Sequence, residues 1–235
     1  MTPMCTVVFD VNETLLDLSA LDPHFTRVFG DSSARSTWFA ALLQMALVST
    51  IVGASNTLTF AQIGGMALER VAAMRGATLS REDIDAIATG MRTLPPHPEA
   101  HEALNLLHDH GIRTAALTNS AQRDAEQQLE NAGLAGSFST ILSVEPTGTF
   151  KPSVDVYRRA AHELGVGADQ LWMVAVHDWD IQGAMNAGWR GAFVNRGSVT
   201  FAQYAPPPHV TGRDLVEVAR AILAAPQVPS PPSAS

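Results

Sequence analysis

The chain is poor in cysteine and in positive charge, and both shortages restrict what it can be. Its 235 residues contain a single cysteine, Cys5, so no disulfide can form within the chain. Disulfides persist in oxidising compartments, so this composition predicts a cytoplasmic protein. The chain has 15 Lys and Arg against 23 Asp and Glu, a net charge of -8. That balance gives no electrostatic support to nucleic-acid binding.

The sequence also lacks a long apolar run. The stretch from Ala40 to Val52 is too short to span a bilayer and predicts a buried helix. A basic segment followed by an apolar stretch and a cleavage site is missing at the N-terminus, so we expect no signal peptide and no membrane partner. With 46% hydrophobic residues, the composition is typical of one large domain or a core domain with a smaller insert.

Short apolar segments alternate with helical patterns along most of the chain. The predicted strands span residues 5–10, 113–119, 140–144, 171–176 and 191–195. The predicted helices between them span 97–111, 120–133, 153–165 and 180–188, and several end in glycine. From about residue 97 onward this alternation predicts an α/β fold, a Rossmann-like parallel sheet with helices on both faces.

Residues 16–94 follow a different pattern, with helical periodicity and no clear strand. Helices are predicted over 37–49, 60–74 and 81–94, with Ser80 as the N-cap of the last. We interpret this block as a helical cap inserted into a catalytic core formed by residues 1–15 and 95–224. The Pro- and Ser-rich end, residues 225–235, is expected to be disordered.

Polar side chains follow several of the predicted strands: Asp10, Thr118, Asn119, Asp178 and Asp180. Ligands of open parallel sheets bind beyond the carboxyl ends of the strands. We therefore expect these side chains to converge at one edge of the sheet. The structural alternatives are turn formation for Asp10, Thr118 and Asn119, and helix capping for Asp180.

A set of residues in a fixed order resembles the haloacid dehalogenase superfamily over nearly the whole chain. The set is Asp10 with Thr14, Thr118 with Asn119, Lys151 followed by Pro152, and Asp180. The resemblance implies that Asp10 is a nucleophile, that Thr14, Lys151 and Asp180 assist it, and that the cap closes the site. A carboxylate nucleophile divides a difficult displacement into two easier steps through an ester. A nearby cation such as Lys151, unless it is a solvated loop residue, would keep that carboxylate ionised despite burial.

Asn12 favours one branch of this superfamily. The phosphatase branch has a second aspartate at this position, which protonates the leaving alcohol, and acidic residues in a GDxxxD motif that hold Mg²⁺. Here these positions are Asn12 and Val176. The chain therefore resembles the metal-independent branch acting on L-2-haloacids (type II), whose leaving halide needs no proton. That resemblance implies hydrolysis of a small 2-haloalkanoic acid through an aspartyl ester, with water as second reactant and no metal or cofactor.

The resemblance also implies a substrate pocket. Thr118 and Asn119 would hold the substrate carboxylate, and Tyr157 and Trp179 match site positions of the branch. The aromatic residues Trp38, Phe39 and Phe60 either line a small apolar pocket or belong to the core of the cap.

Several positions depart from the branch. Phe39 stands where a cap arginine normally holds the leaving halide, and loss of that cation removes electrostatic stabilisation. Asn12 and Glu13 replace a tyrosine and a glycine, and Ala175 and His177 replace a serine and an asparagine. We expect a substrate other than simple 2-chloroacids, or weak activity.

The roles of His177 and Asp178 stay open at this stage. His177 can position water, bind the substrate carboxylate or be satisfied by backbone. Asp178 can pair with Lys151 or with His177.

Two other functions also stay open. One is a Mg²⁺-dependent small-molecule phosphatase with Asp178 recruited as a ligand, which Asn12 disfavours. The other is a catalytically silent binding protein. The joint presence of Asp10, Lys151 and Asp180 disfavours the second, because the fold alone does not require buried charges at strand ends. The dehalogenase branch is often dimeric, so the resemblance suggests a homodimer through the apolar cap helices.

Overall fold

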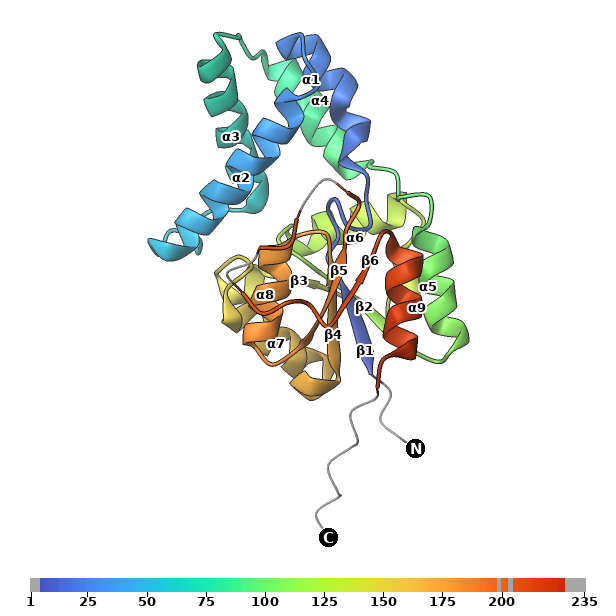
Figure 1. The fold of residues 1–235 in the computed structure, drawn as a ribbon. Helices are drawn as coiled ribbons and strands as arrows, with labels where there is room; N and C mark the ends of the chain where they lie inside the picture. The colour runs from blue at the N-terminus through green and yellow to red at the C-terminus, as the bar shows by residue number, and fades with distance from the viewer. Residues whose placement is uncertain (1–4, 198–199, 203–204, 227–235) are drawn as a thin grey trace.

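The computed structural model describes residues 5–197, 200–202 and 205–226, which form an α/β fold around one parallel sheet (Figure 1). The strands lie in the order β3-β2-β1-β4-β5-β6. Their bounds are Thr6–Phe9 (β1), Arg113–Thr118 (β2), Thr140–Ser143 (β3), Leu171–Ala175 (β4), Arg190–Val194 (β5) and Val210–Gly212 (β6). The predicted parallel sheet and its first five strands are confirmed. Strand β6 was not predicted, because three residues are too few for a periodic signal.

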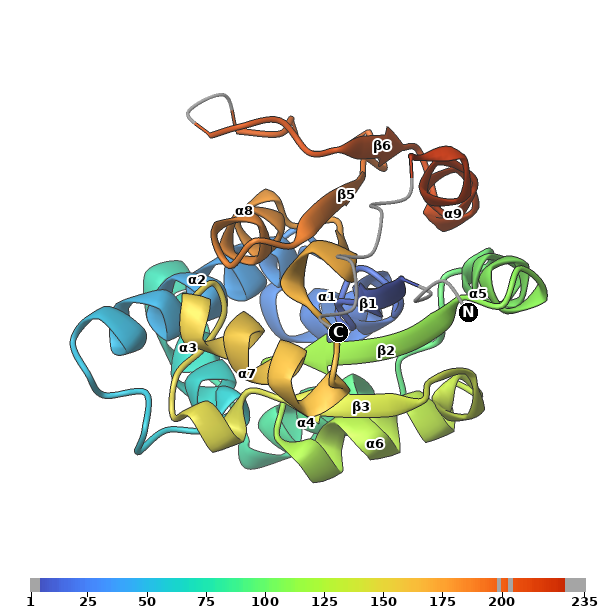
Figure 2. The ribbon, with the colours of Figure 1, turned by 90° about the horizontal axis from the view of Figure 1, so that it is seen from below.

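Helices cover both faces of the sheet, as predicted. In Figure 2, α7 and α8 lie on one side of the strands, and α5 and α9 lie together on the other. The bounds are Ala100–Asp109 (α5), Gln122–Asn131 (α6), Val154–Leu164 (α7), Asp178–Asn186 (α8) and Leu215–Ala224 (α9). Short 3-10 turns occur at Leu18–Leu21, Ala135–Ser137, Glu145–Thr147 and Ala168–Gln170.

The other four described helices lie between β1 and β2 in the chain, beyond the carboxyl ends of the strands (Figure 1). They are Asp22–Phe29 (α1), Ala34–Ile51 (α2), Phe60–Arg75 (α3) and Arg81–Arg92 (α4). The hydroxyl of Ser80 accepts a hydrogen bond from the backbone N–H of Asp83, which confirms it as the N-cap of α4. The proposed boundaries between core and cap stay a prediction, and the expected disordered tail lies almost entirely outside the described residues.

The central strands explain where the polar groups lie. β1 and β4 are buried along their whole length, because helices cover both faces, so their sequences show no alternation. Phe9 is level with Ala116 of β2 and Val174 of β4. The residues that follow these positions therefore meet at one edge of the sheet, beneath helices α1–α4.

Two expectations about helices are wrong. The apolar helix α2 is not buried throughout: Ile51 is 74% exposed, and Leu47 and Val48 are also exposed. Asp180 is not a helix N-cap, because α8 begins at Asp178 and His177 occupies the cap position. In the described part of the chain, none of the helices has the length and apolarity needed to cross a membrane.

Candidate active site

Asp10 lies directly after β1 and is 6% exposed. Its backbone N–H donates to the carbonyl oxygen of Val174, which fixes the end of β1 against β4. The chain then turns back, so the Thr14 hydroxyl donates to Asp10 Oδ2 at 2.7 Å. The same hydroxyl oxygen accepts the backbone N–H of Val176 at 3.2 Å. Thr14 therefore connects the carboxylate to the ends of two neighbouring strands.

Lys151 reaches this carboxylate from the segment before α7. Its ammonium donates to Asp10 Oδ1 at 3.1 Å and to Asp180 Oδ2 at 2.8 Å, and its side chain is 1% exposed. The side-chain oxygen of Asn119, at the end of β2, accepts the Lys151 backbone N–H at 3.0 Å. Lys151 is also the only lysine in the sequence.

The mutual charges set the protonation states of these groups. Burial by itself would raise the pKa of the Asp10 carboxyl, but the Lys151 ammonium and the His177 ring outweigh it and hold that pKa well below its usual range. Burial would lower the pKa of Lys151, yet Asp10 and Asp180 together raise it. Asp10 and Lys151 are therefore both ionised at neutral pH.

Asp180, in the first turn of α8, is fully buried. Burial raises the pKa of its carboxyl; Lys151 opposes this effect and the nearby Asp10 adds to it. The Tyr157 hydroxyl donates to Asp180 Oδ1 at 2.6 Å. Gly183 makes room for this tyrosine, because a Cβ there would lie 2.7 Å from the Tyr157 hydroxyl oxygen. Asp180 is thus oriented by donors on both carboxylate oxygens.

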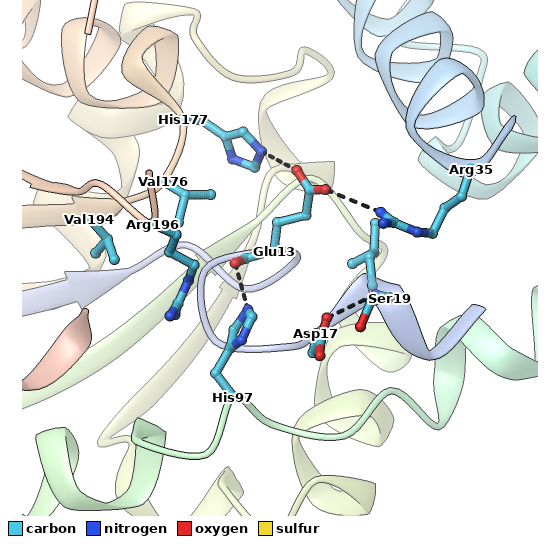
Figure 3. Close-up of a pocket in the computed structure, with 10 residues that line it drawn as sticks. Glu13, Asp17, Ser19, Arg35, His97, Val176, His177, Val194 and Arg196 are labelled. Carbon is cyan, nitrogen blue, oxygen red and sulfur yellow. Dashed lines mark hydrogen bonds and ion pairs between the residues drawn. The ribbon is translucent and has the colours of Figure 1, made fainter. Parts of the chain in front are cut away.

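His177 lies between the carboxylates of Asp10 and Glu13, and Figure 3 shows its contact with Glu13. Its Nδ1 is 3.2 Å from Asp10 Oδ2 and its Nε2 is 3.0 Å from Glu13 Oε2. Burial lowers the pKa of the ring, but Asp10 and Glu13 outweigh burial and raise the pKa to about 10. Of the roles considered from the sequence, satisfaction by backbone is wrong, because both ring nitrogens contact side chains.

Glu13 and Arg35 are parts of this site that sequence reasoning missed. The Glu13 side chain faces a cavity of about 180 Å³, and Arg35 reaches toward it from α2, with its Nη1 3.8 Å from Glu13 Oε1 (Figure 3). Arg35 precedes Phe39 by four residues, which places both on the same face of a helix. That spacing was the available signal for Arg35.

The remaining predicted residues separate into groups. Trp38 and Phe60 line a common cavity of about 130 Å³ between the inserted helices and α6, whereas Phe39 packs on His177 with ring centroids 6.1 Å apart. Thr118 is buried, and its hydroxyl oxygen accepts the Ser120 backbone N–H.

Asn12 and Asp178 are both held away from Asp10. The Asn12 amide hydrogen-bonds Ser120 and Gln128. The expected pairing of Asp178 with Lys151 or His177 is wrong. Its oxygens accept the backbone N–H groups of Trp179 and Ala202 instead, although it lines a cavity together with Asn119 and Lys151.

The donor set does not fit a magnesium site. Within the described ranges, no three His, Cys, Asp or Glu side chains come together as metal ligands. The two oxygens of Asp10 already contact Lys151 and His177, both cations, and a divalent ion there would meet their repulsion.

The sequence matches a known protein family. The family model described as haloacid dehalogenase-like hydrolase matches residues 4–188. The (S)-2-haloacid dehalogenase H-109 of Pseudomonas putida is 27% identical over 225 residues, covering 95% of this chain and 100% of that protein. A phosphoserine phosphatase of Thermus thermophilus is 34% identical over 119 residues, 50% of this chain and 48% of that protein.

A solved structure shows the same fold. The L-2-haloacid dehalogenase of Xanthobacter autotrophicus with chloropropionic acid covalently bound has a TM-score of 0.85 at 23% identity, covering 94% of this chain and 99% of that one. The family match spans most of the chain and includes Asp10, Lys151 and Asp180. The chain belongs to the haloacid dehalogenase-like hydrolase family.

Proposed function

We propose that the protein hydrolyses the carbon–halogen bond of a small 2-haloalkanoic acid through an aspartyl ester. The observation that carries the proposal is the buried, ionised Asp10 beside Lys151, with Asp180 bound to the same ammonium. The names of the Pseudomonas and Xanthobacter relatives support the same substrate class. Substrate and water are the only reactants the scheme requires.

In the first step, an Asp10 oxygen attacks the carbon that bears the halogen. The new carbon–oxygen bond forms as the carbon–halogen bond breaks, and halide leaves with the electron pair. Thr14 and Lys151 orient the carboxylate for this attack through the contacts described above. The leaving halide takes no proton, which agrees with Asn12 in place of an acid.

In the second step, water attacks the ester carbonyl of Asp10. Asp180 accepts a proton from this water, and the products are the 2-hydroxy acid and a restored Asp10 carboxylate. The raised pKa of Asp180 makes it a stronger base than an ordinary carboxylate, and Tyr157 holds it in place.

The substrate lies between the strand ends and the inserted helices. We assign its carboxylate to Thr118 and Asn119, and its short alkyl chain to the apolar surface of Phe39, because Trp38 and Phe60 line a separate cavity. Phe39 and Trp179 bracket the His177 ring next to Asp10, with ring centroids 6.1 Å and 5.0 Å away.

A halide-release assay tests the function. Purified protein in EDTA is offered L-2-chloropropionate, bromoacetate and fluoroacetate, and a generic phosphate ester with Mg²⁺ is offered separately. We expect halide release from at least one haloacid without added metal. If only the phosphate ester were hydrolysed, and only with Mg²⁺, the protein would be a phosphatase. If the protein bound a haloacid without turning over any compound, it would be a catalytically inactive binding protein.

We also propose that the protein forms a homodimer. Leu47, Val48, Ile51 and Val52 expose apolar surface at the end of α2, and Met74 of α3 is exposed as well. Exposed apolar surface favours association. We expect sedimentation to report a dimer of the 25.0 kDa chain and Ile51→Lys to shift it toward monomer, with Glu69→Lys on α3 as the charge-changing control. A monomeric wild-type protein would contradict the proposal.

We also propose that the protein is cytoplasmic. Cys5, the single cysteine, is buried, and burial raises the pKa of its thiol, so it remains protonated and unreactive. A chain with one cysteine forms no internal disulfide, so an oxidising compartment would not stabilise it through such a bond.

A further inference from the structure

The site contains a cation that the cap does not supply. Phe39 occupies the place of the expected halide-binding arginine, and its ring packs on His177. The ring of Trp179 stacks on His177 with centroids 5.0 Å apart and planes 25° apart. These two aromatic residues, one from α2 and one from α8, restrict the orientation of the histidine ring.

The hydrogen bonds of His177 require a doubly protonated ring. A neutral imidazole has one donor and one acceptor nitrogen. Both nitrogens of His177 face carboxylate oxygens, at 3.2 Å from Asp10 and 3.0 Å from Glu13, and an acceptor nitrogen would repel either one.

Glu13 is held toward His177 by its surroundings (Figure 3). Its backbone has φ 64°, a left-handed conformation that disfavours residues with a side chain. The His97 ring contacts its carbonyl oxygen at 3.0 Å, and Arg35 lies 3.8 Å from its second carboxylate oxygen. The chain thus accepts an unfavourable backbone conformation at the position that directs this carboxylate to His177.

Resting on the dehalogenase function proposed above, we propose that Glu13 is a positioning residue that keeps His177 as an imidazolium beside Asp10, in place of a cap arginine. The ring contacts Asp10 Oδ2, while Lys151 contacts Oδ1, so the two cations act on opposite oxygens. When Asp10 becomes an ester, it loses its charge, and among the described residues Glu13 is then the one carboxylate in contact with the ring. Glu13 therefore keeps the His177 ring protonated while the displaced halide is still nearby.

Other charged groups around His177 support this assignment. Asp10 approaches from β1 and Glu13 from the loop that follows, while the α2 and α8 neighbours, Phe39 and Trp179, are neutral. Asp178 is turned to backbone N–H groups. Arg35 and His97 contact Glu13 rather than the ring.

We expect the His177 ring to lose its proton only at alkaline pH. The His177 pKa, raised to about 10, keeps the ring charged through neutral pH and releases its proton as the pH rises through that value. Glu13→Gln keeps the size of the side chain but removes its charge. We expect the His177 pKa to fall by about one unit or more, measured by NMR of the ring nitrogens of the full chain.

Catalysis should follow the same titration. In Glu13→Gln, we expect the alkaline limb of the kcat profile for halide release to move down by the same interval, which gives about a twofold loss at pH 9 that grows toward tenfold above pH 10. Glu69→Gln, which removes a charge from the exposed surface of α3, should leave both titrations unchanged.

The variant Glu13→Gly distinguishes an effect on stability from an effect on the protonation of His177. Glycine relieves the left-handed backbone conformation, so this variant should be at least as stable as the wild type while showing the same fall in His177 pKa. An unchanged His177 pKa in both variants would overturn the proposal. Because the NMR titration needs no substrate, a falling pKa without halide release would refute the dehalogenase function and leave the Glu13–His177 pairing supported.

Discussion

Replacing Asp10 with Asn is expected to lower kcat for halide release by at least about 10⁴-fold, the scale typical of removing a nucleophile. The amide has nearly the same shape as the carboxylate, so the pocket persists while the attacking anion is lost. Halide release by ion chromatography measures the effect. In the wild type, a single turnover in ¹⁸O-water with enzyme in excess should yield product without label, because its new oxygen comes from Asp10.

Asp178→Asn is the matched control for this variant. It makes the same chemical change at a neighbouring acid whose oxygens accept the backbone N–H groups of Trp179 and Ala202 rather than contacting Lys151 or His177. We expect Asp178→Asn to keep most of the activity. If Asp10→Asn retained a comparable rate, or if label entered the product in the first turnover, direct attack by water would replace the aspartyl ester.

Replacing Lys151 with Met should give the largest loss of stability, about 3–5 kcal/mol at neutral pH, the usual penalty for removing one partner of a buried ion pair. Asp10 and Asp180 would then lie buried together without the cation that both contact. Halide release should fall at least about 10³-fold, because the charge that orients and ionises the nucleophile is gone. Urea unfolding gives the free energy, and the halide assay gives the rate.

The free energy of unfolding should depend on pH differently in the wild type and in Lys151→Met. In the wild type, Asp10 has a lowered pKa, so it stabilises the fold above its unfolded-state pKa, and this contribution is lost as the pH falls through the folded-state value. Without Lys151, burial raises the carboxyl pKa values of Asp10 and Asp180. The destabilisation of Lys151→Met should therefore be larger at pH 8 than at pH 5.

A second variant separates charge from packing. Lys151→Met combined with Asp180→Asn removes one buried cation and one buried anion, and should recover a large part of the lost stability without restoring activity. If the double variant were as unstable as the single one, lost packing around the lysine stem rather than unpaired charge would explain the result.

The sequence by itself determined the parallel sheet and the order of its catalytic groups. Asp10 and Asp180 were predicted to lie together because they follow buried strands, whose carboxyl ends meet at one edge of a parallel sheet, and Lys151 was predicted from the resemblance of its motif to that of the family. Three elements were not predicted. β6 has only three residues, too few for a periodic signal. The boundary signals of α1 and α9 were present but not used: Gly30 ends α1, and Asp214 is the N-cap of α9.

Only the tertiary structure decided what surrounds the nucleophile. Glu13 and His177 are 164 positions apart in the sequence, and no local pattern indicates that they meet. Whether Asp178 contacted Lys151 or backbone N–H groups depended on the first turn of α8, and whether a charged ring lies beside Phe39 depended on the contacts of His177. Charges interact through space, so their partners and pKa values follow from chain packing and not from spacing along the chain.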